Sequence, residues 1–248
     1  MKILVCISHV PDTTSKINFS ADGAEFDTNG VQYVINPYDE FSLARAMWFK
    51  EKQGASVTVI TVGDASTEPS LRKSLAIGAD DAIRIDAEAT DGFAVAKQLA
   101  EVIKGNSYDL ILMGRESIDY NGAMVPGILS TLIDFNFINA CVGLEIEGTA
   151  ATATKEIDGG TESLSSSLPL VVAGQKGLVE EKDLRIPNMR GIMMARKKPL
   201  AVVASNNAEA LTKAVKFDKP EEKSACKMVD AGAIDDLIDL LHNDAKVI

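Results

Sequence analysis

Residues 2–8 read KILVCIS, a short and almost continuous apolar run. Runs of this kind are typical of a strand that is buried on both faces of a parallel sheet. Residues 39–53 then place apolar side chains at helical spacing, and Gly54 follows as a helix stop signal. Residues 56–62 (SVTVITV) are rich in β-branched side chains and predict a second strand. The chain therefore opens with a predicted strand–helix–strand unit.

The same alternation continues to about residue 135. Strands are predicted at residues 81–86 and 109–113, and helices at residues 69–77, 92–104 and 124–132. Strands separated by helices of this length form right-handed βαβ units, so we predict an α/β fold with a doubly wound, mainly parallel sheet. Ligands of such sheets lie beyond the carboxyl ends of the strands, near the point where the strand order reverses. Small or polar residues occupy three of these ends, at residues 8–12, 62–64 and 114–122.

Beyond about residue 140 the pattern changes to short strand-like runs joined by tight turns. Residues 157–160 (IDGG) are a strong hairpin signal, because glycine accepts the backbone angles of such turns. We therefore expect a β-hairpin extension of the sheet. The strands predicted in this part are residues 143–147, 150–156, 162–167 and 170–173.

The last quarter of the chain has few large apolar side chains. Residues 176–199 hold two prolines, two glycines and a basic cluster, which predicts a long excursion outside the core. Residues 204–228 are polar and rich in lysine, and residues 235–242 predict a short amphipathic helix. We therefore divide the chain into an α/β domain, residues 1–200, and a C-terminal arm, residues 201–248, that needs another surface to lie on.

The net charge of 25 − 36 = −11 and the pI near 4.7 exclude some classes of partner. Binding to nucleic acid needs a basic face, and no apolar run reaches the roughly 18 residues of a membrane helix, so we expect neither nucleic-acid binding nor membrane insertion. Three cysteines without a C-x-x-C pair fit a reducing compartment. No leader pattern precedes the first strand, and we expect a cytoplasmic location.

Two stretches are candidates for ligand binding. Residues 114–130 (GRESIDYNGAMVPGILS) lead from a strand through a loop into a helix opened by Pro126, where free amides and the helix dipole could bind an anion. An ordinary βα turn is the alternative, and neither a GxGxxG nor a P-loop motif is present. Residues 36–39 (NPYD) precede the first helix; Asp39 is a plausible N-cap, and Asn36 could bind an adenine edge or a ribose.

A basic stretch, residues 185–198, interrupts the acidic chain. Charge runs are usually solvated faces, but the methionines and isoleucines between these basic residues suit a docking surface. Neither a catalytic triad, nor a pair of carboxylates, nor a set of metal ligands forms a motif. We therefore expect no catalytic residue and no metal, and a chain that binds a nucleotide and a partner.

Residues 154–162 (TKEIDGGTE), followed by residues 168–172 (LPLVV), resemble the signature of the beta subunit of electron transfer flavoproteins. Further similar stretches occur in family order along nearly the whole chain: Val10–Thr13, Asn36–Glu40, Leu75–Asp80, Ser117–Asp119 and Ile186–Asn188.

This resemblance implies a fold of the adenine-nucleotide-binding type and a heterodimer. The alpha subunit would hold most of a redox-active FAD, and the beta subunit would bury a structural AMP. Electrons would arrive from flavin dehydrogenases such as acyl-CoA dehydrogenase and leave to a quinone reductase or another acceptor, so the chain would be an electron carrier and not an enzyme. Two alternatives stay open. One is a bifurcating complex that oxidises NADH and holds FAD in place of AMP; the other is a nucleotide-binding module of the universal-stress type.

The resemblance also assigns residues. Many members carry Thr and Gln where this chain has Gly122 and Met124. The candidate partner-docking residues are Ile186, Pro187 and Met189, with Ile186 as the anchor. The candidate cofactor-binding residues are Cys6, Asn36, Pro37, Tyr38, Asp39, Val62, Asp119, Tyr120, Asn121, Gly122, Ala123, Met124, Val125, Pro126, Gly127, Ile128, Leu129 and Ser130.

Overall fold

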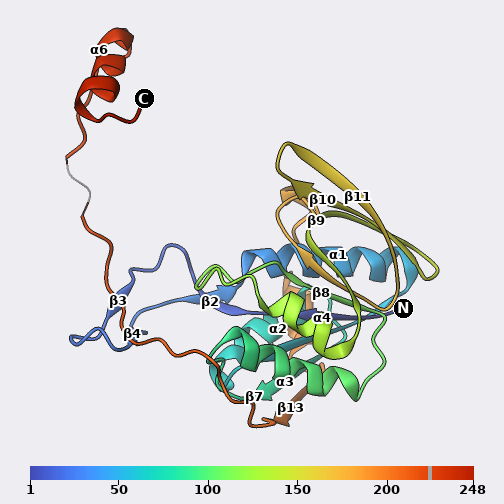
Figure 1. The fold of residues 1–248 in the computed structure, drawn as a ribbon. Coiled ribbons are helices and arrows are strands. Elements are labelled where there is room, and N and C mark those ends of the chain that lie inside the picture. Colours follow the sequence, from blue (N-terminus) through green and yellow to red (C-terminus); the bar gives the residue numbers. More distant parts are fainter. Residues whose placement is uncertain (223–224) are drawn as a thin grey trace.

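A nine-stranded sheet dominates the computed structural model, which describes residues 1–222 and 225–248 (Figure 1). The strand order is β11-β10-β9-β12-β8-β1-β6-β7-β13, and the seven strands from β9 to β13 in this order all pair in parallel. The strands are β1 (Lys2–Cys6), β6 (Ser56–Val62), β7 (Asp81–Asp86), β8 (Leu110–Gly114), β9 (Asn136–Glu147), β10 (Ala150–Ile157), β11 (Gly160–Ser167), β12 (Leu170–Gly174) and β13 (Leu200–Ala204).

Helices cover both faces of this sheet. The helices are α1 (Pro37–Gln53), α2 (Glu68–Ile77), α3 (Gly92–Lys104), α4 (Val125–Ile133), α5 (Met189–Ala195) and α6 (Ile234–Asp239). Short one-turn segments lie at Ala65–Thr67, Glu181–Asp183 and Leu240–Asp244, and two small antiparallel pairs join β2 (His9–Pro11) to β5 (Tyr33–Ile35) and β3 (Asn18–Phe19) to β4 (Phe26–Asp27).

The central strand β1 explains why its sequence is almost continuously apolar. Ile3 and Val5 point to the face covered by α1 and α2, where Phe49 is fully buried. Leu4 points to the opposite face, where Leu99 of α3 packs. Because side chains alternate along a strand, a strand covered on both faces must be apolar at every position. The predicted α/β, doubly wound, mainly parallel sheet is confirmed.

The strand order reverses beside β1. The chain adds β6 and β7 on one side of β1, crosses over through α3, and places β8 on the other side. The connections after β1 and β8 therefore diverge to opposite faces and open a crevice at the carboxyl ends of the two strands. The sequence predicted a ligand site at this edge of the sheet.

The antiparallel extension also follows the prediction. β10 pairs with β11 through the turn at residues 157–160, and Gly159 has a φ of 81°, which glycine accepts freely. β10 also pairs antiparallel with β9, so that the three strands project from one edge of the sheet (Figure 1).

Four predicted boundaries are corrected by the structure. The first helix begins at Pro37, so Asn36 is its N-cap and Asp39 lies inside its first turn. β9 begins at Asn136 rather than at 143, because its first half pairs with β12. The β13 strand, Leu200–Ala204, belongs to the sheet, since it pairs with β7, and the arm therefore begins after residue 204 and not at 201.

The fourth correction concerns residues 176–199, which are not wholly outside the core. Leu178 and Ala195 are buried within the cluster beneath α1 and α2. Asn188 caps the short helix α5 by accepting a hydrogen bond from the Gly191 N–H at 2.8 Å. Gly191 packs so closely on α2 that a Cβ atom would lie 2.3 Å from the carbonyl oxygen of Ala76.

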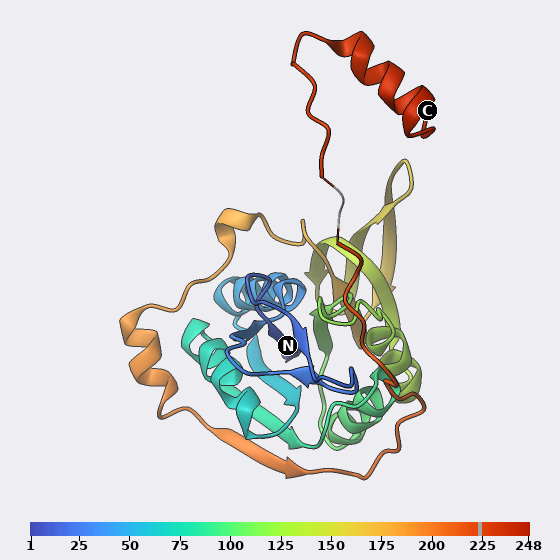
Figure 2. The same ribbon diagram turned by 90° about the vertical axis from the view of Figure 1, so that its left-hand side faces the viewer.

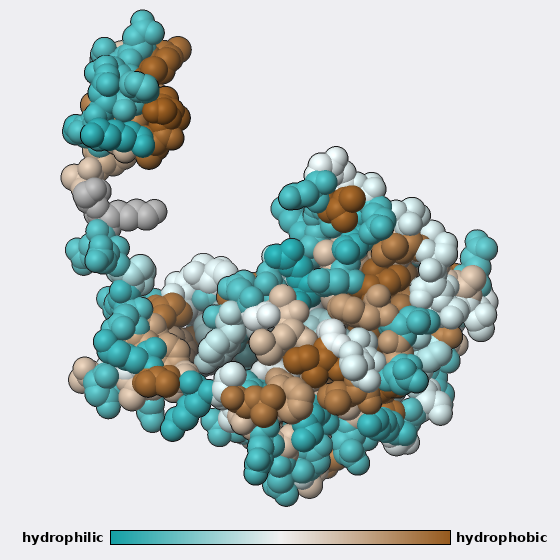
Figure 3. All heavy atoms as spheres, in the orientation of Figure 1, coloured by the Kyte–Doolittle hydropathy of each residue, from teal (hydrophilic) through white to brown (hydrophobic). Residues whose placement is uncertain are grey.

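The arm first crosses its own subunit and then leaves it. Gln98 of α3 bonds the Ser205 hydroxyl at 2.8 Å, and Phe217 stacks on Phe19 with ring centroids 5.2 Å apart. Past this contact the chain runs away from the body to α6, near the predicted 235–242 helix (Figure 2). Hydrophobic residues gather on one side of this C-terminal segment (Figure 3). Within residues 1–222 and 225–248, no helix has both the length and the apolar character that crossing a bilayer requires.

Candidate functional site

A cavity of about 890 Å³ lies at the carboxyl ends of β1, β6, β7 and β8. This volume is within the range of small-molecule sites, roughly 300–1,000 Å³. Ten of the predicted cofactor-binding residues line the cavity: Cys6, Asp39, Val62, Asp119, Tyr120, Gly122, Ala123, Met124, Val125 and Pro126. The other eight do not line it: Asn36, Pro37, Tyr38, Asn121, Gly127, Ile128, Leu129 and Ser130.

Asp39 ties the two central strands together at the floor of the cavity. Its Oδ2 accepts a hydrogen bond from the Ser8 N–H at 2.7 Å, and its Oδ1 accepts one from the Gly114 N–H at 2.6 Å. Burial raises the pKa of Asp39 to about 7, although both hydrogen bonds favour the charged form. A Cβ atom at Gly114 would lie 2.6 Å from the Asp39 Oδ1, so the close approach requires glycine.

Asn36 supports the loop above the cavity. Its side-chain amide donates to the Glu116 carbonyl at 2.8 Å and accepts from the Ile118 N–H at 3.2 Å. The Asn36 side chain is fully buried and faces this loop rather than the cavity. Asn36 therefore positions residues 115–124 and is already hydrogen-bonded within the protein.

The start of α4 has the features of an anion site. No side chain in the described part of the chain caps this helix, and Pro126 lies in its first turn. Asn121 and Ala123 in the loop before it adopt φ angles of 50°, in the left-handed region that costs about 1 kcal/mol or more for a non-glycine residue. Val125 and Pro126 line the cavity. The uncapped amides and the helix dipole therefore favour a negatively charged group here.

Beyond the first turn, α4 belongs to the core instead. Leu129 is fully buried among the side chains of α3 and the sheet, and Ser130 donates its hydroxyl to the Gly127 carbonyl at 2.8 Å. These residues support the helix and do not reach the cavity wall.

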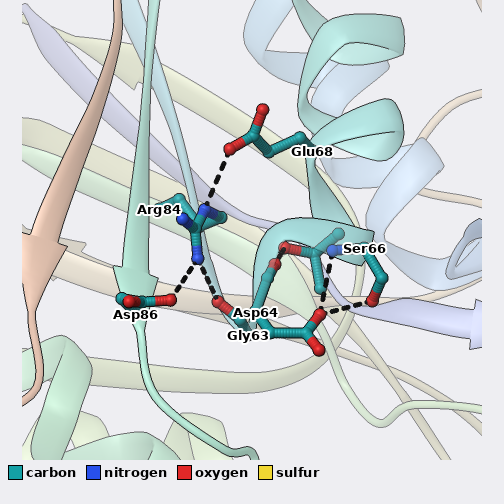
Figure 4. A network of polar contacts seen from close by, with 7 residues as sticks. Gly63, Asp64, Ser66, Glu68, Arg84 and Asp86 are labelled. Carbon is teal, nitrogen blue, oxygen red and sulfur yellow. Dashed lines mark hydrogen bonds and ion pairs between the residues drawn. The ribbon is translucent and has the colours of Figure 1, made fainter.

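The polar network around Arg84 shapes the β6 and β7 side of the cavity (Figure 4). The Arg84 guanidinium donates to the Gly63 carbonyl at 3.0 Å, to Asp86 at 2.5 Å and to Glu68 at 3.2 Å. Its side chain is only 7% exposed, so its charge is committed to these partners. Asp64 accepts from the Ser66 N–H at 2.9 Å and fixes the turn after β6.

His9, the first residue of β2, lines the cavity. Its ring stacks on Tyr33 with centroids 4.7 Å apart, and its Nδ1 lies 2.9 Å from the Ser70 hydroxyl. Burial lowers the pKa of His9, while the nearby Asp64 carboxylate opposes that shift. The neutral ring therefore serves as an aromatic wall with one polar edge.

Thr67, Val95 and Leu99 line the cavity but were not predicted from the sequence, and neither were two longer segments of its wall. One is the connection from β7 to α3, residues 87–92, and the other is the arm at residues 212–214. Asp91 immediately before a predicted helix was a visible N-cap signal for the first, and its Oδ1 accepts from the Ala94 N–H at 2.8 Å. The polar arm carried no signal for the second.

The predicted docking residues lie on a separate surface beside α5. Ile186 is 89% exposed and Met189 is 76% exposed, while Pro187 is half-buried. Pro187 and Ile192 line a hollow of about 520 Å³ between α5 and α2. Ile186 therefore makes little contact with its own subunit.

Part of the basic stretch has a structural role instead. The Lys198 ammonium bonds the Leu75 carbonyl at 2.9 Å at the end of α2, where a cation also complements the helix dipole. Arg185 pairs with Glu51 at 2.8 Å. In the part of the chain that the structure describes, Arg190, Arg196 and Lys197 form no ion pair.

The sheet and its crevice define a doubly wound α/β protein with a ligand-sized cavity at its switch point. A family model described as the electron transfer flavoprotein domain matches residues 24–208. The chain is 34% identical to electron transfer flavoprotein subunit beta of Bacillus subtilis (strain 168) over 100% of both chains. It is 38% identical to the protein of the same name from Syntrophomonas wolfei over 91% of this chain and 88% of that one, and 30% identical to the Homo sapiens protein over 82% and 81%.

These matches are consistent along the chain, and the chain therefore belongs to the electron transfer flavoprotein family, among its beta subunits.

Proposed function

We propose that this chain is the beta subunit of a heterodimeric electron transfer flavoprotein. It carries electrons from a flavin dehydrogenase to a quinone reductase or another acceptor and has no substrate turnover of its own. The family match over residues 24–208 supports the role, and the cavity between β1 and β8 supports nucleotide binding in this subunit. The three widely spaced cysteines, without a C-x-x-C pair, favour a reducing compartment such as the cytoplasm.

In this proposal the cavity holds AMP. Its phosphate lies at the uncapped start of α4, near Val125, and its adenosine lies against the apolar wall that includes Val62. Asp39 and Asn36 hold the strand ends and the loop in place without contacting solvent. The redox-active FAD is held mainly by the alpha subunit, and it supplies the electron-carrying chemistry when bound.

The experiment that tests this role uses the complex of this chain with the alpha subunit from the same source. Adding a flavin dehydrogenase and its substrate, such as an acyl-CoA dehydrogenase with an acyl-CoA, is expected to bleach the visible absorbance of the bound flavin. If no dehydrogenase reduces the flavin of an intact, flavin-loaded complex, the carrier role is contradicted.

Replacement of Ile186 by Ala is expected to weaken coupling to the electron-donating dehydrogenase by about 1–3 kcal/mol. An exposed apolar tip surrounded by charged residues has the layout of a binding hot spot with a polar rim. The measurement is the dependence of the flavin reduction rate on dehydrogenase concentration.

Val202→Ala is the matched control, because Val202 is also exposed but lies on the edge strand β13. Both variants are expected to keep wild-type thermal stability and flavin content. An Ile186→Ala complex that transfers electrons at wild-type rates at every dehydrogenase concentration would remove Ile186 as the anchor.

A further inference from the structure

The C-terminal arm forms one wall of the cavity at the switch point. Thr212, Lys213 and Ala214 line it, although they lie far along the chain from the strand ends, and about 120 residues after Asp91, to which the arm is bonded. Asp91 holds this segment: its Oδ2 accepts hydrogen bonds from the Leu211 N–H at 2.7 Å, the Thr212 N–H at 2.8 Å and the Thr212 hydroxyl at 3.1 Å. The other oxygen of the same carboxylate caps α3.

This attachment brings the arm close to the start of α4. Gly92, the residue after Asp91, packs directly against that helix start: a Cβ atom at Gly92 would lie 2.6 Å from the Met124 Cγ and 3.3 Å from the Val125 Cγ2. The starts of α3 and α4 therefore lie in contact. The arm is hydrogen-bonded to Asp91, the N-cap of α3. Lys213 follows Thr212 at this junction and borders the same cavity as Val125.

Among the residues that the structure describes, the charges that line the cavity leave one cation for an anionic ligand. The lining carboxylates are Asp39, Asp64, Glu88, Asp91, Glu116 and Asp119. Of the two lysine and arginine side chains that line the cavity, Arg115 pairs with Glu116 at 2.8 Å. Lys213 forms no ion pair with any residue in ranges 1–222 and 225–248.

A phosphate near six carboxylates is stabilised when a cation lies beside it, and the unpaired Lys213, which lines the same cavity as the uncapped start of α4, can supply that charge. We infer that the arm is a strap across the nucleotide cavity and that Lys213 binds the phosphate of the nucleotide held there. This inference rests on the proposed nucleotide site and adds to it a residue and a segment that lie outside the predicted binding set.

The test compares AMP with adenosine, which lacks the phosphate. Binding of both is measured by titration of the complex with the alpha subunit after removal of bound nucleotide. Lys213→Gln is expected to weaken AMP binding roughly tenfold and to leave adenosine binding unchanged, because a charge-assisted hydrogen bond is lost only from the phosphate. Lys216→Gln is the control, since Lys216 pairs with Asp218 at 2.7 Å and does not line the cavity.

A second variant tests the strap itself. Asp91→Ser keeps a hydroxyl that can cap α3 and removes the oxygen that holds Leu211 and Thr212. AMP is expected to dissociate several-fold faster from this complex. Unchanged AMP release from Asp91→Ser, or an unchanged AMP-to-adenosine affinity ratio in Lys213→Gln, would overturn the inference. A wild-type complex that binds neither AMP nor adenosine would instead contradict the nucleotide site on which the inference rests.

Discussion

Replacement of Asp39 by Ala is expected to lower the free energy of unfolding by about 2–5 kcal/mol. The Asp39 carboxylate accepts the buried N–H groups of Ser8 and Gly114, one from each side of the switch point. Alanine leaves both donors without a partner and removes the link between the ends of β1 and β8. Denaturant unfolding of the complex with the alpha subunit, with nucleotide removed, measures the change.

The Asp39→Asn variant keeps one of the two oxygen acceptors and cannot titrate, so the pH dependence of the difference between the two proteins isolates the titration of Asp39. The folded-state pKa of Asp39 is about 7, above its ordinary value near 4, so the folded protein keeps the proton over a range in which the unfolded chain has lost it. The part of the stability that depends on the Asp39 proton is therefore fully present at low pH and is lost as the pH rises from about 4 to about 7. The stability of wild type relative to Asp39→Asn is expected to fall over this window. A flat difference between the two proteins would contradict a buried, proton-holding Asp39.

Deletion of residues 220–248 is expected to weaken association with the alpha subunit by roughly a hundredfold or more. The α6 helix stands away from the body, and Ile234, Leu237 and Ile238 are 64%, 45% and 49% exposed (Figures 1 and 2). Burying side chains of this size on a partner contributes about 1.5–3 kcal/mol each. The dissociation constant of the heterodimer, measured by analytical ultracentrifugation, reports the loss.

The deletion keeps residues 205–219, so the contacts of Phe217 with Phe19 and of Asp91 with the arm are retained. The truncated chain should therefore fold and keep its nucleotide cavity. Leu237→Ser is expected to weaken association in the same direction, and Asp235→Asn on the same helix should not. A deletion variant that pairs with the alpha subunit at wild-type affinity would show that the arm has another use.

The parts of the fold that the sequence predicts are those with strong local patterns. The apolar run of β1 is typical of a strand buried on both faces, and the apolar residues of α1 recur at helical spacing. The residues at 157–160 are typical of a hairpin turn. β13 was missed because an edge strand is half-exposed and its residues, LAVVA, are few. The first half of β9 was missed because its side chains alternate weakly and only pairing with β12 makes it a strand.

The sequence likewise predicted only part of the candidate site. Strand ends and the start of α4 follow from the order of elements, and ten of the predicted residues line the cavity. The Asn36 side chain was expected to be available for a ligand, but tertiary contacts to residues 116 and 118 use its hydrogen bonds. No periodicity relates Asp91 to the arm about 120 residues later, so only the folded chain brings Lys213 to the cavity.

The nucleotide content of the complex tests the central claim most directly. The complex of this chain with the alpha subunit is purified without dialysis, denatured in acid, and its released nucleotides are counted by chromatography and mass spectrometry. We expect one FAD and one AMP per heterodimer. Two FAD molecules without AMP would contradict the AMP site and indicate the bifurcating type of complex, and release of no flavin and no nucleotide would contradict the electron-carrier account as a whole.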